Sequence, residues 1–237
     1  MLTRLSVASA CTALAMITAM SSAQADLVQV GPVSASGAGV GNSGTILTVS
    51  AQANATTESG SVTPVNGSPS CVSVASPCDA PKFSVPTLGQ LGWTSGTDVG
   101  LIFNANEPNS DSITIPAGDL VLSFYNGNTL ITSFTNSADL VYSSTAPGQG
   151  NIGFLIGLDS TQAMLADSSV FNLANSQDFR IGLSAGFIDV AGGDESFTAQ
   201  LGPTAPVPGP VVGAGLPGLI TACFGLLALA RRRRMAS

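Results

Sequence analysis

The sequence predicts an all-β fold: an antiparallel, jelly-roll-like β-sandwich with one short helix, followed by a C-terminal transmembrane helix. Short segments alternate apolar and polar residues with a period of two, and clusters of Gly, Pro and Asn separate these segments. Period-two alternation is typical of half-buried strands, and many short strands with frequent turns favour a sandwich. A twenty-residue uncharged run near the C-terminus is long enough to cross a bilayer.

Residues 1–25 have the features of a secretory signal peptide. Arg4 supplies a positive start, Val7 to Met20 is mostly apolar, and Ala23 and Ala25 form an A-x-A cleavage site. The alternative, a retained N-terminal anchor, fits less well because the apolar run is short and a cleavage site follows it. We therefore expect export by the secretion machinery and cleavage by signal peptidase before Asp26.

The exported part, residues 26–206, is long enough for one domain with its own core. It contains all fourteen acidic residues but only Lys82 and Arg180 of the seven basic ones, so its net charge is −12. Binding to phosphate backbones requires clustered Lys and Arg. The composition therefore excludes nucleic acid as a partner.

The first half of this domain shows strands of uneven strength. Leu47 to Asn54 and Val99 to Ala105 alternate clearly, Val28 to Val33 is a weaker candidate, and Phe83 and Val85 alternate before Pro86. The segments from Ser34 to Gly44 and from Ser59 to Ser70 hold turn residues without periodicity, so we expect loops there.

Cys71 and Cys78 are the only cysteines of the exported domain, because Cys11 falls in the signal peptide and Cys223 in the apolar run. In an oxidising compartment they predict a local disulfide. The eight-residue loop it closes corresponds to about 2.5 kcal/mol in the chain-entropy model. The spacing does not fit a CxxC redox motif, and metal ligation by two thiolates without histidine is the weaker alternative.

The second half of the domain contains the clearest strands. Asn126-Gly127 separates two strand-like runs and predicts a hairpin, because a type I′ turn needs positive φ at its centre. Asp159 to Asp167 predicts the one short helix, with a cap formed by Asp159 and Gln162. The predicted strands cover Ile113–Ile115, Leu120–Tyr125, Thr129–Thr135, Ile152–Leu158, Phe179–Phe187 and Phe197–Leu201.

The residue types argue against catalysis. The chain has no histidine, which removes Ser-His-Asp and Cys-His sites and histidine-dependent metal sites. No phosphate-binding or dinucleotide-binding glycine motif lies between a strand and a helix. Paired carboxylates from distant strands stay open as a glycosidase-like alternative. We expect no enzyme activity and no cofactor.

Two weak binding signals remain. Asp189, Asp194 and Glu195 lie close together around a predicted turn and form a candidate calcium site, because calcium prefers hard oxygen ligands. The simpler interpretation is a solvated acidic turn, so we assign no metal. Trp93, Tyr125 and Tyr142 could stack on sugars if they shared one face, although ordinary packing is the favoured interpretation because the domain has so few aromatic residues.

The C-terminal tail, residues 207–237, has the layout of a membrane anchor. The uncharged span 211–230 corresponds to about 30 Å of helix, and Arg231, Arg232, Arg233 and Arg234 follow it directly. Such a basic cluster favours a cytoplasmic C-terminus. A buried core helix is the alternative, but the span has no polar face. Gly202 to Pro210 forms a Pro/Gly linker before it.

A Pro-rich motif, an apolar helix and a terminal arginine cluster together resemble the PEP-CTERM sorting signal of exopolysaccharide-producing Gram-negative bacteria. The motif here is Val207, Pro208, Gly209 and Pro210, with Gly209 where the family usually has Glu. The resemblance implies processing by an exosortase-like membrane protease at or near the motif. It covers the tail and implies sorting, not an activity.

A second resemblance is looser. The hairpin LVLSFYNGNTLITSF, then GFLIGLDSTQA, FRIGLSA and AGGDESF, resembles a β-domain of other exported PEP-CTERM proteins, which carries no known activity. We therefore expect a non-enzymatic protein that is anchored in the inner membrane at least transiently and then reaches the cell surface or matrix, with exopolysaccharide as a candidate partner. The alternatives are a carbohydrate-binding or adhesive module and, less favoured, a polysaccharide-active enzyme.

Overall fold

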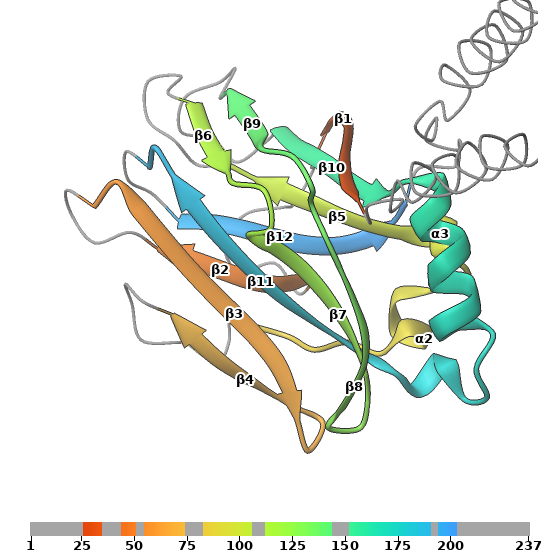
Figure 1. The fold of residues 1–237 in the computed structure, drawn as a ribbon. Helices are drawn as coiled ribbons and strands as arrows, with labels where there is room; N and C mark the ends of the chain where they lie inside the picture. The colour runs from red at the N-terminus through yellow and green to blue at the C-terminus, as the bar shows by residue number, and fades with distance from the viewer. Residues whose placement is uncertain are drawn as a thin grey trace, which may run out of the picture.

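Two antiparallel β-sheets dominate the computed structural model, which describes residues 26–34, 44–50, 55–73, 83–105, 112–143, 152–190 and 194–202 (Figure 1). The first sheet has the order β1-β10-β5-β12-β2, and the second has the order β4-β3-β11-β6-β9, with β7 pairing with β11 and β8. The predicted all-β, sandwich-like fold is confirmed. The strands are β1 (Leu27–Ser34), β2 (Thr45–Ser50), β3 (Thr57–Val65), β4 (Ser68–Ser73), β5 (Val99–Asn104), β6 (Ser112–Ile115), β7 (Leu120–Asn126), β8 (Thr129–Thr135), β9 (Leu140–Ser143), β10 (Ile152–Leu158), β11 (Arg180–Ile188) and β12 (Asp194–Leu201).

The core lies between the two sheets and follows the period-two pattern of the strands. On β11, Ile181, Leu183, Ala185 and Phe187 are all buried, as the alternation predicts. The Phe187 ring stacks on that of Phe103 from β5, with the ring centres 5.5 Å apart. Burying a large apolar side chain stabilises a fold by about 1.5–3 kcal/mol, so the side chains buried between the two sheets hold the sheets together.

Two hairpins organise the second sheet, and only one of them was expected. The predicted Asn126-Gly127 hairpin is confirmed between β7 and β8, with Gly127 at φ 60°. The prediction of a loop at Ser59 to Ser70 is wrong, because β3 and β4 form a hairpin there. Its turn is Asn66-Gly67, with φ values of 53° and 79°, a pair of positive φ angles that type I′ turns require.

The reason for this error lies in the inward positions of β3. Glu58, Gly60, Val62 and Pro64 are the buried residues of the strand, and they alternate with more exposed Thr and Ser. Because only one of the four is a large aliphatic residue, the sequence shows no hydrophobic alternation. Backbone pairing with β11 on one side and β4 on the other holds this strand in the sheet.

Helical segments lie at one end of the sheets (Figure 1). The predicted helix is confirmed as α3 (Ser160–Ala166), where the Asp159 carboxylate accepts a hydrogen bond from the Gln162 backbone N–H at 2.8 Å. It continues as a π-helical turn, η4 (Asp167–Phe171), and a 3₁₀ turn, η5 (Ser176–Asp178), follows. A second helix, α2 (Leu88–Leu91), was missed, although Thr87 and Gln90 give it a capping box. The 3₁₀ turn η2 (Gly96–Asp98) follows it.

Several predicted segments lie outside the described residues: the signal peptide 1–25, the turn at Gly192-Gly193, the sorting motif Val207 to Pro210, the span 211–230 and the arginine cluster. Within the ranges that the structure describes, no helix is long and apolar enough to cross a membrane. The transmembrane prediction for the tail therefore stays a prediction.

Candidate functional site

The three carboxylates of the calcium candidate do not converge. Asp194 and Glu195 are neighbours in β12, so their side chains point to opposite faces of the sheet. Asp194 accepts a hydrogen bond from Ser50 Oγ, whereas Glu195 is fully buried in the interior. Asp189 follows β11 in a left-handed conformation and accepts a bond from Thr114 Oγ1 at 3.3 Å. Among the described residues, no three or more Asp, Glu or Cys side chains gather where they could hold a metal ion.

Glu195 instead meets Glu58, a residue that the sequence analysis did not select. Glu58 lies on β3 in the second sheet and Glu195 on β12 in the first, with exposures of 4% and 0%. All four carboxyl oxygens are hidden from solvent. The two carboxyl groups lie close enough for Glu58 to shift the pKa of Glu195. We call these two residues the carboxyl pair.

The electrostatics of the carboxyl pair follow from its burial. Burial, first, and then the neighbouring Glu58 raise the pKa of Glu195 to about 9, and Asp194 adds a smaller effect in the same direction. Arg180 is the only basic side chain in the part of the chain that the structure describes. Its guanidinium donates to the Val85 carbonyl at 2.7 Å, at the other end of β11. The raised pKa keeps the Glu195 carboxyl protonated at neutral pH.

The aromatic residues considered as sugar platforms separate into buried and accessible ones. Trp93 is fully buried, and its Nε1 donates to the Gln200 carbonyl at 2.7 Å. Tyr142 is also fully buried, packed between Phe103 and Phe154 with ring centres 4.7 and 4.8 Å away, and burial raises its pKa. Tyr125 alone of the three is partly exposed. Trp93 and Tyr142 are core residues, and the three rings do not share one binding face.

Two rows of mostly small hydroxyl side chains cross the outer face of the second sheet. One cross-strand row contains Val72, Ser61, Ser184, Val121 and Thr135, and the next contains Ser70, Thr63, Gly182, Ser123 and Ser133. We call these two rows the hydroxyl face. They cross β4, β3, β11, β7 and β8, which lie side by side (Figure 1).

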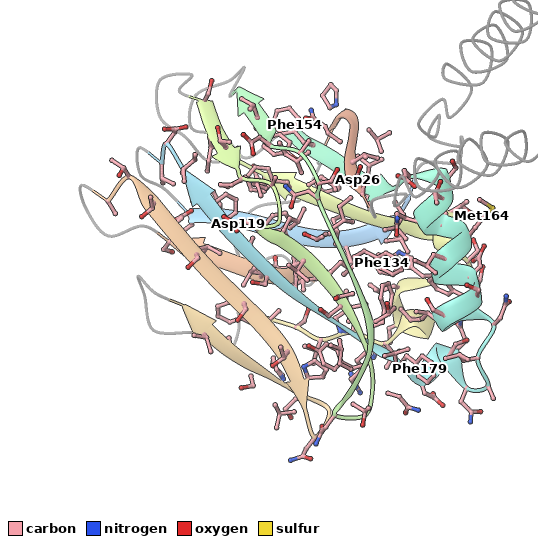
Figure 2. The ribbon with its side chains drawn as sticks, viewed as in Figure 1. Asp26, Asp119, Phe134, Phe154, Met164 and Phe179 are labelled. Atoms are coloured by element: carbon pink, nitrogen blue, oxygen red, sulfur yellow. The ribbon has the colours of Figure 1, made fainter. Side chains whose placement is uncertain are left out.

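Glycine and tyrosine shape the centre of the hydroxyl face. A Cβ atom at Gly182 would lie 2.9 Å from Cε2 of Tyr125 and 2.8 Å from the Val62 carbonyl, so the Tyr125 ring lies against Gly182. Two charged side chains lie near the described residues of β11. Arg180 begins the strand, and Asp119 lies over Gly186 toward its other end (Figure 2).

Cys71 lies on β4 opposite Val62 and packs partly against the core. Its expected partner Cys78 lies outside the described residues, so the Cys71–Cys78 disulfide stays a prediction.

Comparison with protein-family models, curated proteins and solved structures finds no match to this chain. The function must therefore be argued from the residues and the fold.

Proposed function

We propose that this chain is an exported, non-enzymatic protein of the cell envelope or extracellular matrix of an exopolysaccharide-producing Gram-negative bacterium, sorted by its PEP-CTERM-like tail. One observation carries the proposal: an acidic β-sandwich occupies residues 26–202, between the signal-peptide features of residues 1–25 and the sorting features of residues 207–237. The finer description of this domain as jelly-roll-like, followed by a membrane span at 211–230, belongs to the same proposal.

The proposed route defines the partners. The secretion machinery exports the chain and signal peptidase removes residues 1–25. The span 211–230 then holds the protein in the inner membrane, with Arg231 to Arg234 on the cytoplasmic side. An exosortase-like protease processes the tail near Pro208 and Pro210. Exopolysaccharide is the proposed neighbour of the released domain.

The carboxyl pair supports a non-catalytic role. A glycosidase needs two carboxyl groups on either side of a substrate bond, with room for a sugar between them. Glu58 and Glu195 are neighbours in the core, and all four of their carboxyl oxygens are closed off from solvent, so a substrate cannot reach them. The raised pKa of Glu195 therefore reflects packing between the sheets.

Cell fractionation tests the sorting proposal. In the native host, the wild-type chain is expected in the envelope or matrix fraction. A variant with Arg231 to Arg234 changed to Ser loses its stop signal and is expected to be mislocalised. A Pro208→Ala/Pro210→Ala variant is expected to accumulate in the inner membrane with its tail uncleaved. An equal distribution of all three proteins would contradict the proposal.

The hydroxyl face favours a second candidate function, a carbohydrate-binding or adhesive module for neutral polysaccharide. The domain is strongly acidic, yet these two rows carry hydroxyl groups and glycine without a charge, and the Tyr125 ring lies against Gly182 in the next row, opposite Arg180. Neutral sugars offer hydroxyls for hydrogen bonds and flat faces for aromatic rings. The third candidate, a polysaccharide-active enzyme, gains no comparable support.

Affinity electrophoresis in gels containing neutral polysaccharide tests this second candidate. Tyr125→Ala is the informative variant because its ring is accessible. Trp93→Ala is unsuitable, since removing a buried tryptophan costs about 3–5 kcal/mol of stability and would affect binding indirectly. Retardation of the wild type that Tyr125→Ala abolishes would support the module, and migration of both proteins unaffected by any polysaccharide would reject it.

A further inference from the structure

We propose that one end of the hydroxyl face is a binding site for a uronate, an acidic sugar residue within a largely neutral polysaccharide. Arg180 holds the carboxylate of the uronate, and Tyr125 packs against its ring. This site deepens the second candidate function and rests on it, because it names the sugar that one end of the face takes. Three observations carry it: the cross-strand pairing of Arg180 with Tyr125, the fixed guanidinium beside a hairpin turn, and the positive charge in an acidic domain.

The strand register places Arg180 and Tyr125 side by side on the outer face. They are cross-strand partners on β11 and β7, one row beyond Gly182 and Ser123. Both occupy outward positions of their strands, and both are partly exposed. Residues directly opposite each other in an antiparallel pair have Cβ atoms about 4.5–5.5 Å apart. A single sugar residue can therefore contact both side chains.

The guanidinium of Arg180 is held in one position. Its Nη1 donates to the Val85 carbonyl at 2.7 Å. A Cβ atom at Gly67 would lie 3.8 Å from both Nε and Nη2, so this edge of the guanidinium lies beside the turn between β3 and β4. Nε and Nη2 together form an edge through which arginine binds a carboxylate by two parallel hydrogen bonds. Because the bond to Val85 already orders the side chain, binding loses less conformational entropy.

Two hairpin turns border the site, and their side chains join them (Figure 1). The Asn66 N–H donates to Asn128 Oδ1 at 2.7 Å, and Asn128 Nδ2 donates to Asn66 Oδ1 at 3.0 Å. Both asparagines are exposed. Each side-chain amide offers two N–H donors and two lone pairs, more than these bonds use. The joined turns therefore provide further hydrogen-bonding groups for sugar hydroxyls.

The apolar surface of the site comes from Tyr125 and its neighbour on β8. Because Gly182 has no side chain, the Tyr125 ring lies over this part of the sheet. Leu130, the cross-strand partner of Tyr125 on β8, is 52% exposed. A pyranose ring has a face of C–H groups that packs on such a surface, while the tyrosine hydroxyl stays available for a hydrogen bond.

The charge of Arg180 identifies the class of sugar. Arg180 is the one basic side chain among the residues that the structure describes, in a domain whose net charge is −12. A carboxylate forms charge-assisted hydrogen bonds with a guanidinium, which a neutral sugar cannot do. A densely charged polyuronate would be repelled by the acidic domain, although repulsion beyond about 8 Å is screened in physiological salt. The arrangement therefore suits isolated uronates rather than a polyuronate.

Isothermal titration of the full chain in mild detergent tests the site, with a chelator present to remove divalent cations. The probe is an oligosaccharide of one glucuronate on three xylose residues, compared with the same oligosaccharide after reduction of its carboxyl group. The wild type is expected to bind the uronate form about tenfold more tightly. Arg180→Gln is expected to abolish this preference, whereas Tyr125→Ala should weaken the binding of both forms.

Asp119→Asn is the control variant, because it also changes one charge on a residue that lies over this face. Asp119 lies over Gly186, six residues or roughly 20 Å along β11 from Arg180, and this variant should keep the wild-type preference. Arg180→Lys retains the charge without the planar fork and should keep only part of it. Trp93 fluorescence melts check that each variant is folded.

The wild type alone can overturn the proposal if Arg180→Gln does not fold. Equal affinity for the two oligosaccharides would reject the uronate site and leave the neutral-polysaccharide module in place. Failure to bind either oligosaccharide or any neutral polysaccharide would reject both. A folded Arg180→Gln protein that still prefers the uronate form would overturn the role of Arg180, and with it the proposal.

Discussion

Gly96 begins η2 at a point where no side chain fits. A Cβ atom there would lie 2.2 Å from the Ala163 carbonyl oxygen and 2.6 Å from the Ala163 Cα, both backbone atoms of α3. The Gly96 N–H also donates to Asp167 Oδ1 at 2.6 Å, so the loop cannot shift freely. Overpacking typically costs 1–3 kcal/mol, and contact with rigid backbone places Gly96→Ala at about 3 kcal/mol.

This loss corresponds to a decrease in Tm of roughly 6–12 °C for a domain of this size. Trp93 fluorescence or circular dichroism can follow the melt. Gly127→Ala is the matched control, because Gly127 has φ 60° and nothing within 4 Å of its added Cβ. The control should lose only about 1–2 kcal/mol, from backbone strain alone. A Gly96→Ala protein that melts within a degree of wild type would refute the close packing of α3 on η2.

Two further predictions concern buried and capping hydrogen bonds. Asn136 accepts a hydrogen bond from the Leu120 N–H and donates to the Pro116 and Ala138 carbonyls. Asn136→Ala should therefore lower the free energy of unfolding in urea by about 2–4 kcal/mol, and Asn136→Asp by at least as much. An Asn136→Asp protein as stable as the wild type would contradict this prediction. Burial opposes ionisation of Asp98, but hydrogen bonds from Thr94 and Ser95 outweigh it and hold the pKa of this carboxyl below 3.8. The wild type should therefore lose stability as the pH falls below 3.8 while Asp98→Asn loses less, and parallel acid melts of the two proteins would contradict the assignment.

The sequence predicted those strands whose buried face carries large apolar residues. β5, β7, β10 and β11 all alternate visibly, and Asn126-Gly127 identifies its hairpin without any tertiary information. β3 escaped notice because Glu58, Gly60 and Pro64 occupy inward positions that usually hold aliphatic residues. α2 is four residues long, too short for helical periodicity to appear.

The neighbours of the candidate site residues could not be predicted from local sequence patterns either. Glu195 was selected from the sequence, but as part of an exposed acidic turn rather than as a core residue. Its actual neighbour, Glu58, is 137 positions away in the chain and belongs to the opposite sheet. Local patterns predict which face of a strand is buried, but pairing between sheets depends on register and packing, which no local pattern contains.

The signals at the two chain ends can be tested together by intact-mass spectrometry of the mature protein from its native host. The account predicts a chain that begins at Asp26 and lacks Arg231 to Arg234, because both signals are removed on the way to the envelope. A mature protein that still ends in RRRRMAS would contradict processing of the tail and leave a permanent membrane anchor in its place.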